Sequence, residues 1–476
     1  MNRLDNVLAP ERRGRPARRW GLTCAVACAL ARPDLGLPAA LAEGQISAAA
    51  YPSIQAALDA NPGQMIFVPP GDHPLAGPIV IGKDGAGLCG PGRLVQTDTN
   101  APVLHIRHAR GVRVRDLSLS RASGRTVARA SAIRAEHCAD LVLEGLTISN
   151  NRSAAASIWL ENCTHSEVVR CRIENYMTLS VDDRTASPHY GYAFRCIDGT
   201  GVGASSCRGL VVAANRVVEH ELRPTPELKA RHRLGDFVRR AATKGALVSQ
   251  QTWEAGYVNN WHQGSAMVVT APEQSDYVRI LDNHIENGAQ GIDIHADHVT
   301  ITGNTVVNCF IGMKAMHGSR HVLVANNQFS RNDLWAIGLM PGTAAHAATA
   351  AAAGQGPRSA NVDGGSLIAN NIISGFGYGD SYWIWGATGS TRAPILLDRG
   401  QEPDDPPLAE VLVIGNIVFD TSRDGVLVDG VPKVEPPRYR HAVFISPGPT
   451  GPRGLRFSGN LFHPGTEGVA NIQLPP

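Results

Sequence analysis

The chain has 476 residues, of which 50 are glycine and only 5% are aromatic, and its formal charge is +2. Abundant glycine with few aromatic residues is typical of many short strands joined by tight bends, and it argues against a helical or α/β enzyme. The near-neutral charge argues against nucleic acid as a partner, so an anionic ligand would have to be recognised by a local patch.

We expect residues 1–42 to be a secretory signal peptide. Five arginines within residues 12–19 precede an apolar stretch over residues 21–31, and residues 40–42 offer a small-residue cleavage site. A disordered leader is the alternative, because residues 32–34 (Arg-Pro-Asp) interrupt the apolar run. No later run is long enough to cross a bilayer. We therefore expect a mature chain over residues 43–476 that is periplasmic or secreted, without membrane insertion.

Residues 51–60 are predicted to form a short amphipathic helix, followed by a strand at residues 65–68 and a turn at residues 69–71. The open end of a repeat protein must be covered, and a helix at this position would cover it. The segment is therefore expected to cap the repeats that follow it.

The rest of the chain is predicted to be one β-solenoid, because an apolar-x-x-Asn-x-apolar element recurs along it. Around Asn283, Asn304 and Asn327 the spacing is 21 and then 23 residues, and later intervals of 44 or 45 imply one coil plus an insertion. The same register runs through Leu117, Leu146, Cys171, Asn215, Asn283, Asn304, Asn327, Asn371, Asn416 and Asn460. Turns about 22 residues apart indicate a parallel β-helix, since propeller blades need about 40 residues each. Stacked asparagines would then satisfy one another and the turn backbone.

Seven cysteines remain once the two in residues 1–42 are removed, and this odd number excludes a fold held only by disulfides. Cys138 and Cys163 occupy the same place in successive repeats, and no cysteine has paired metal-ligand spacing. We therefore expect a buried ladder of small thiol side chains.

The helix at residues 51–60 and the asparagine-bearing repeats together resemble the pectate-lyase-like superfamily over essentially the whole mature chain. The resemblance implies an all-β fold, a single-stranded, right-handed parallel β-helix of ten or more coils with loop insertions. It also implies a group that contains carbohydrate lyases, hydrolases and epimerases, with phage and structural relatives beside them.

Alternation in the strands that precede the turns predicts which side chains face out. The predicted inward residues are Ile158, Leu160, Phe194, Ile292, Ile294, Met313, Ala315, Ile337 and Leu339, and the predicted outward residues are Trp159, Glu161, Arg195, Asp293, His295, Lys314 and Asp398. Because neighbouring strands lie about 4.8 Å apart, Asp293 and Lys314 should be side by side, with His295 about 6.6 Å further along its strand. The alternative is an ordinary surface ion pair.

Insertions beside these strands would form the walls of a cleft. The longest, residues 222–264, has seven basic side chains and ends in aromatic residues, which suits an acidic sugar polymer. The predicted substrate-binding residues are Trp159, Trp261, His262, His317, Arg320, Trp335, Arg239, Arg240, Tyr382 and Trp383. Aromatic residues in loops could equally pack on one another and pin the loop. Residues 341–365 are expected to form an Ala- and Gly-rich loop, within which residues 344–356 are expected to be flexible and to carry no chemistry.

Ca²⁺ is the one cofactor that the sequence suggests, with Asp293, Asp182 and Asp183 as its candidate ligands. Paired carboxylates could also serve glycoside hydrolysis as acid and base. Because adjacent residues of a strand face opposite ways, a paired role for Asp182 and Asp183 requires them to lie in a loop.

The clustered charges favour β-elimination from a uronic-acid polymer, which needs a neutraliser for the carboxylate, a base and an acid. Arg195, or Ca²⁺ at Asp293, could neutralise the carboxylate. Lys314 or His295 could be the base, and Tyr190 or Tyr192 the acid. A neighbouring carboxylate makes a lysine a poorer base, so Lys314 suits that role best if a metal occupies Asp293.

Residues 291–295 also resemble the Asp-x-His site of the alginate C5-epimerases, although Gln290 stands where that family has a catalytic Tyr and Ile294 replaces its Pro. The first interpretation is a polysaccharide lyase acting on acidic polysaccharide or oligosaccharide. An epimerase comes second and an inverting hydrolase third. The rival class is a non-catalytic polysaccharide-binding or surface protein. For either class we expect a monomer or a homotrimer.

Overall fold

A computed structural model describes most of the chain after residue 44. The described residues are 45–183, 192–223, 225–234, 237–239, 263–351, 356–380, 392–400, 404–419, 426–428, 430–433 and 436–476. The predicted signal peptide at residues 1–42 lies outside them. No helix in the described ranges is long and apolar enough to cross a membrane.

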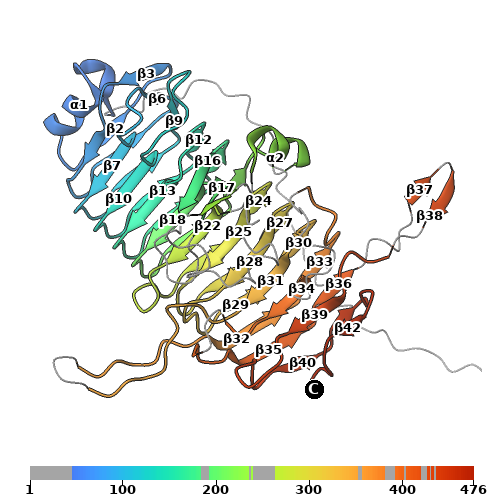
Figure 1. Ribbon diagram of the computed structural model, residues 1–476. Coiled ribbons are helices and arrows are strands. Elements are labelled where there is room, and N and C mark those ends of the chain that lie inside the picture. The colour runs from blue at the N-terminus through green and yellow to red at the C-terminus, as the bar shows by residue number, and fades with distance from the viewer. Residues whose placement is uncertain are drawn as a thin grey trace, which may run out of the picture. The chain divides into compact units, whose positions relative to one another are not determined.

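Three long parallel sheets make up the solenoid, and each coil contributes one strand to each sheet (Figure 1). Sheet 1 has 13 strands: β1 (Ile46–Ser47), β2 (Met65–Phe67), β5 (Gly87–Cys89), β8 (Arg113–Arg115), β11 (Val142–Glu144), β14 (Glu167–Val169), β19 (Val211–Ala213), β23 (Arg279–Leu281), β26 (Thr300–Thr302), β29 (Leu323–Ala325), β32 (Gly364–Ala369), β35 (Ala409–Ile414) and β40 (Arg456–Ser458). Sheet 2 has 12: β3 (Asp72–Leu75), β6 (Arg93–Gln96), β9 (Ser118–Arg121), β12 (Thr147–Ser149), β15 (Arg172–Glu174), β20 (Arg216–Val218), β24 (His284–Glu286), β27 (Thr305–Val307), β30 (Gln328–Ser330), β33 (Ile372–Ser374), β36 (Ile417–Phe419) and β41 (Leu461–Phe462).

Sheet 3 also has 12 strands, and it carries the residues singled out above. Its members are β4 (Ile79–Ile81), β7 (Leu104–Arg107), β10 (Ile133–Glu136), β13 (Ala156–Glu161), β18 (Thr200–Ser205), β22 (Ser265–Thr270), β25 (Gln290–Ile294), β28 (Ile311–Ala315), β31 (Trp335–Leu339), β34 (Ala393–Leu397), β39 (His441–Ile445) and β42 (Gly468–Ala470). The remaining elements are the 3₁₀ helix η1 (Ala48–Ala50), the helices α1 (Ile54–Ala60) and α2 (Pro226–His232), the antiparallel strands β16 (Thr178–Asp183), β17 (Tyr192–Asp198) and β21 (Phe237–Arg239), and the hairpin β37 (Val426–Val428) and β38 (Val431–Lys433). The predicted all-β parallel β-helix is confirmed.

The core runs along the inside of the coils, as the alternation predicted. All the predicted inward residues except Phe194 are at most 2% exposed, and the side chain of Phe194 lies outside the described part. Between sheets 1 and 2, the predicted asparagine ladder is present. Nδ2 of Asn304 donates to Oδ1 of Asn327 at 2.9 Å and to the carbonyl of Ile280 at 2.9 Å, and Oδ1 of Asn304 accepts from Asn283. Each buried amide therefore has its partners within the ladder.

The N-terminal end is covered by α1, as expected (Figure 1). Ser53 caps the helix by accepting the backbone N–H of Ala56, and Ile54 and Leu58 are buried beneath it. Gln55 bonds both backbone groups of Val80 in β4, the first strand of sheet 3, at 2.8 and 3.2 Å. The helix therefore satisfies an edge that would otherwise be open.

The seven cysteines of the described part are free and buried. Cys138 and Cys163 lie at equivalent positions of successive coils, and Cys207 continues the series on the next coil, where Arg208 pairs with Thr164. The expected ladder of small buried thiols is confirmed.

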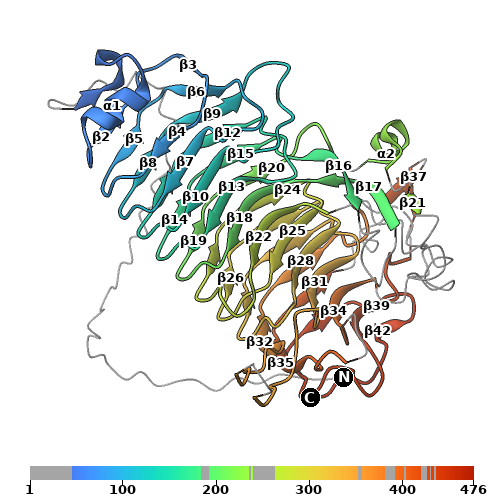
Figure 2. The same cartoon turned by 60° about the vertical axis from the view of Figure 1, so that its left-hand side comes forward.

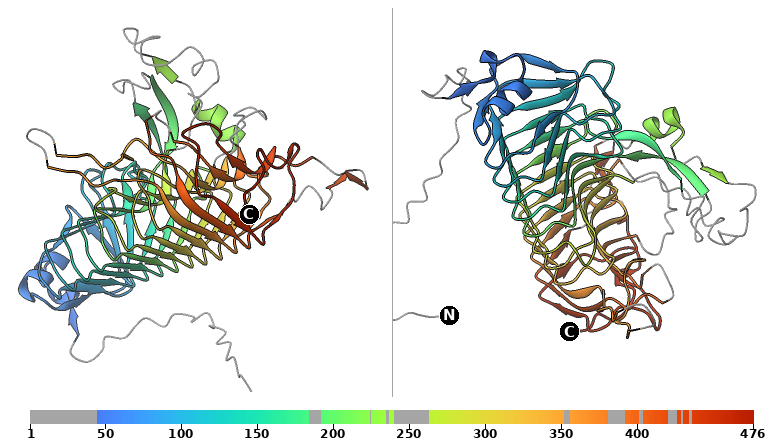
Figure 3. Two further views of the ribbon diagram at one scale, coloured as in Figure 1. Left: turned by 90° about the horizontal axis from the view of Figure 1, so that it is seen from below. Right: turned by 90° about the vertical axis from the view of Figure 1, so that its left-hand side faces the viewer.

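One strand alignment was wrong, and it changes the place of Arg195. The coil strand between β13 and β22 is β18, in which Val202 pairs with Ile158 and Met267. Residues 192–196 lie instead in β17, antiparallel to β16, and this hairpin runs out from the stacked coils (Figures 2 and 3). Glycine is depleted in strands, so the Gly-rich β18 gave a weak strand signal.

Candidate functional site

Asp293 and Lys314 face outward on neighbouring strands of sheet 3 and contact each other. They are direct partners in the register of β25 and β28, and Nζ of Lys314 lies 3.3 Å from Oδ2 of Asp293. His295, just after β25, approaches the other carboxylate oxygen, with Nε2 3.0 Å from Oδ1. The predicted side-by-side placement is confirmed, whereas the catalytic roles of these residues stay a prediction.

The carboxylate of Asp293 is buried, with 7% of the residue exposed. Burial by itself would raise its pKa, but the charges of Lys314 and His295 outweigh burial and hold the pKa of Asp293 well below its usual range. Ser265 on β22 adds a hydroxyl 3.4 Å from Oδ2. The cluster therefore contains one group that stays negative at all working pH values.

Both ring nitrogens of His295 face a protein group. Nδ1 lies 3.2 Å from Oγ1 of Thr270, the last residue of β22, and Nε2 faces Asp293. The Nε2 contact has the distance of an ion pair but not the alignment of a hydrogen bond, since in the described part neither Nε2 nor Oδ1 has a hydrogen-bond partner. The result is an Asp–His–Thr series in which the carboxylate orients the imidazole. Thr270 was not among the predicted site residues, because residues 265–270 were not recognised as a coil strand.

His317, predicted to bind substrate, lies against His295. The two rings meet edge to face, with centroids 4.5 Å apart. Burial, reinforced by the charges of His295 and Lys314, lowers the pKa of His317 to about 4. Its Nδ1 accepts the backbone N–H of Ala344 at 3.3 Å, so the proton of the neutral ring sits on Nε2. His317 is therefore a neutral hydrogen-bond donor near pH 7.

Described residues of the predicted Ala- and Gly-rich loop, 341–365, contact His317 and the turn that follows it. Asn361 donates to the carbonyls of both His317 and Ala344, at 2.8 Å each. Its backbone also pairs with His346 in an antiparallel bridge. Asp363 accepts the backbone N–H groups of Gly318 and Ser319. The hydrogen bonds of Asn361 and Asp363 therefore hold the residues that follow β28 in place.

Two tryptophans lie along the outer face of sheet 3 on either side of the cluster. A Cβ on Gly203 would come within 2.5 Å of the ring of Trp159, and one on Gly338 within 3.2 Å of the ring of Trp335. Both indoles therefore rest on an outward glycine. Gly338 is the direct neighbour of Lys314 in the sheet. A glycine at an outward strand position is a signal by which sequence reasoning could have located these rings.

The other predicted residues lie elsewhere. Arg195 on β17 is exposed, and it donates to the carbonyl of His232 at the end of α2. Asp182 and Asp183 are consecutive in the regular strand β16, so their side chains point to opposite faces, and the loop that their pairing requires is not formed. Arg320 pairs with Asp297 at 2.9 Å. Tyr190, Trp261, His262, Arg240, Tyr382 and Trp383 are outside the described residues, as are the side chains of Tyr192 and Arg239.

Ca²⁺ does not fit the surroundings of Asp293. This ion takes six to eight oxygen ligands. Asp293 instead meets Nζ of Lys314 and Nε2 of His295, one on each oxygen.

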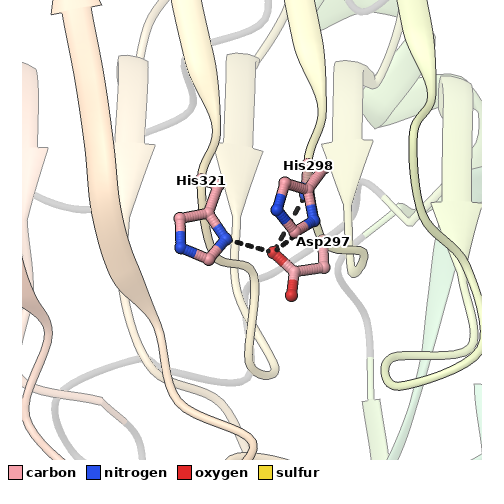
Figure 4. Close-up of side chains that lie close together, drawn as sticks. All are labelled: Asp297, His298 and His321. Carbon is pink, nitrogen blue, oxygen red and sulfur yellow. Dashed lines mark hydrogen bonds and ion pairs between the residues drawn. The ribbon is translucent and has the colours of Figure 1, made fainter.

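A second cluster, at the turns after β25 and β28, does combine ligands for a metal ion. Asp297, His298 and His321 place one ligand atom each within 4.8 Å of the others (Figure 4). This cluster is separate from the predicted catalytic residues, and none of its three residues was among the predicted metal ligands.

Comparison with known proteins supports the fold. One family, described as "Periplasmic copper-binding protein (NosD)", matches residues 241–336, about a fifth of the chain. No curated protein sequence matches the chain. Among solved structures, the Agl-KA catalytic domain is 10% identical over 92% of this chain and 70% of its own, with a TM-score of 0.50.

Two further solved structures fall below that score. A PL6 alginate lyase in complex with a trisaccharide is 12% identical over 87% of this chain and 84% of its own, with a TM-score of 0.48. The A-module of the Azotobacter vinelandii mannuronan C-5 epimerase AlgE6 is 13% identical over 86% of this chain and 94% of its own, with a TM-score of 0.44. At these identities the likeness concerns the fold alone.

Proposed function

We propose that the chain is a polysaccharide lyase that cleaves a uronic-acid-containing polysaccharide by β-elimination at the cluster of Asp293, His295, Lys314 and His317. The observation that carries the proposal is the composition of this cluster: one ionised carboxylate in contact with two nitrogen groups, Lys314 and His295, with a third, His317, packed against His295. Glycoside hydrolysis needs a second carboxyl group, and one of the pair must be protonated to act as the acid. The low pKa of Asp293 does not suit an acid, and the contacts described for Asp293 include no second carboxyl group.

The proposed base is Nδ1 of His295. Asp293 faces Nε2 and stabilises the positive charge that the ring acquires when Nδ1 takes the C5 proton. Nδ1 faces Thr270, so the substrate would approach from the side of that hydroxyl. The electrons of the broken C5–H bond form the C4–C5 double bond, and the bond from C4 to the leaving oxygen breaks.

The remaining roles go to groups around this base. The ammonium of Lys314 is proposed to bind the uronate carboxylate and to stabilise the charge that develops on it, in place of Arg195. The Nε2–H of His317 is a donor for the same developing charge. Tyr190 or Tyr192 remains the proposed acid for the leaving oxygen. Trp159 and Trp335 are proposed platforms for the flanking sugars.

A C5-epimerase is the second candidate, because it starts from the same proton abstraction. The contact between Asp293 and His295, which form the Asp-x-His element, favours it. The two reactions differ in the fate of the carbanion: elimination gives an unsaturated sugar, while epimerisation returns a proton to the opposite face. The signal peptide predicted at residues 1–42 supports a periplasmic or secreted location for either enzyme.

The test measures ultraviolet absorbance of unsaturated uronide with the purified mature chain on alginate, polygalacturonate, glucuronan and glycosaminoglycans, and proton exchange at C5 in deuterated water. We expect absorbance to rise on one of these polymers and to be lost in His295→Ala and Lys314→Ala. His105→Ala is the matched control, because His105 is an outward histidine of sheet 3 in the same register row as Asp293, on β7. Exchange without absorbance would favour the epimerase. Neither signal on any polymer would reject both enzymes.

A further inference from the structure

The turns that follow β25 and β28 place two imidazoles face to face. His298 and His321 both adopt the left-handed backbone conformation, with φ of 50° and 55°. Their rings stack with centroids 4.4 Å apart, because equivalent turn residues of successive coils lie one strand spacing apart. Tyr277, on the preceding coil, stacks on the other face of His298 at 4.8 Å. The ring of His298 is therefore held between two neighbours.

Asp297 brings a carboxylate oxygen to the edge of this stack (Figure 4). Its Oδ1 lies 2.9 Å from Nδ1 of His321 and 3.5 Å from Nδ1 of His298. Its Oδ2 is bound by Arg320 at 2.9 Å, and its Oδ1 also accepts the backbone N–H of His298 at 2.9 Å, so Oδ1 is the oxygen that faces both imidazoles. The side chains of His298 and His321 are 43% and 50% exposed, so an ion can reach the three ligand atoms from solvent.

We propose that Asp297, His298 and His321 bind a divalent transition-metal ion, Cu²⁺ or Zn²⁺. Two imidazole nitrogens and one carboxylate oxygen suit these ions, whereas Ca²⁺ and Mg²⁺ require oxygen ligands. Ligands about 2.1 Å from a tetrahedral zinc ion lie about 3.4 Å from one another. The ligand atoms here lie within 4.8 Å, so exposed rings need only a small rotation to close on the ion. Water completes the coordination.

The neighbouring groups predict how the affinity will respond to substitution. Arg320 adds a positive charge beside the site and holds one oxygen of Asp297. Replacing it with a neutral residue should therefore strengthen metal binding. His108 and His137 offer a matched control, because their rings also stack, at 5.0 Å, but no carboxylate forms a metal-ligating group with them in the described part of the chain.

The experiment titrates the metal-free mature chain with Zn²⁺ by calorimetry and with Cu²⁺ by electron paramagnetic resonance, in which two nitrogen ligands split the signal. We expect one ion per chain. His298→Ala, His321→Ala and Asp297→Ala should each weaken binding at least tenfold, His108→Ala should leave it unchanged, and Arg320→Gln should tighten it several-fold. A gain in affinity cannot come from misfolding. Arg320→Gln therefore tests the proposal even if an alanine variant is unstable.

Two outcomes would overturn the proposal: unchanged affinity in the double variant His298→Ala with His321→Ala, or an equal loss in His108→Ala. Binding does not depend on the lyase proposal, and it is measured without substrate. The two ideas can therefore fail separately.

Discussion

Nζ of Lys314 lies 3.3 Å from Oδ2 of Asp293, and the two residues are direct partners on adjacent strands. Their side chains are 16% and 10% exposed, so neither charge is well hydrated. Removal of one partner from a buried ion pair leaves the other charge uncompensated, at a cost of about 3–5 kcal/mol. The contribution of this ion pair to the free energy of unfolding can therefore be measured separately from any role in catalysis.

We expect Lys314→Met to lower the free energy of unfolding by about 3 kcal/mol, because the buried carboxylate of Asp293 loses its ammonium partner. The double variant Lys314→Met with Asp293→Leu should recover most of this loss, since an apolar pair needs no hydration. Chemical denaturation of the four proteins gives the coupling between the two sites. Additive losses would contradict the ion pair.

The low pKa of Asp293 predicts a specific pH dependence of stability. A carboxyl group whose pKa is depressed by folding stabilises the protein fully above the unfolded value of about 3.9, and this contribution is lost as the pH falls through the folded value. The stability difference between the wild type and Asp293→Asn should therefore be constant from pH 7 to about 5 and shrink below about 4. Unfolding curves at a series of pH values measure it, and a difference that persists at low pH would argue against an ionised Asp293.

His317 and Asp363 should give opposite pH slopes. The pKa of His317 is lowered to about 4, whereas burial raises the pKa of Asp363 to about 7. The pKa of a histidine in the unfolded chain is about 6.5, so between about pH 6.5 and 4 the unfolded chain binds a proton at residue 317 that the folded chain does not. Stability therefore falls as the pH drops toward 4, by up to about 3 kcal/mol. For Asp363 the folded state holds the proton, so that stability is greatest below about pH 3.9 and is lost as the pH rises through 7.

These slopes oppose each other in the wild type between about pH 4 and 6.5. His317→Gln should therefore lose stability more steeply as the pH rises, and Asp363→Asn should lose it more steeply as the pH falls. Urea unfolding across this range measures both. If the two variants run parallel to the wild type, the protonation states assigned to these residues are wrong.

The asparagine ladder should be weakest at its end. Asn304 lies inside the ladder and bonds Asn283 and Asn327 through their side chains, whereas Asn460 accepts from Asn416 as the last member. Asn304→Ala leaves buried polar groups unpaired on both neighbours and should cost about 2–6 kcal/mol, since each unsatisfied group costs about 1–3 kcal/mol. Asn460→Ala should cost about half as much. Thermal and chemical unfolding measure both losses. If Asn304→Ala and Asn460→Ala lose the same stability, the ladder does not act through contacts between neighbours.

The contact between Asp293 and Lys314 could be predicted from the sequence, but the position of Thr270 could not. The 21-residue spacing of Asn283 and Asn304 gives the register of adjacent coils, and alternation within each strand gives the face. Thr270 belongs to a coil that follows the long insertion at residues 222–264, where the spacing no longer identifies the strand. Arg195 was misplaced for the same reason: two segments in that region alternate, and only β18 enters the sheet.

Sequence alone determined the repeat, the inward residues, the asparagine ladder and the capping helix, because a solenoid converts a constant interval into a constant distance along its axis. The tertiary structure decided what the insertions contribute. It placed Ala344 on His317, and it placed Asn361 on the carbonyls of both. The path of an insertion follows from its contacts rather than from the repeat period, so sequence periodicity cannot supply those pairings.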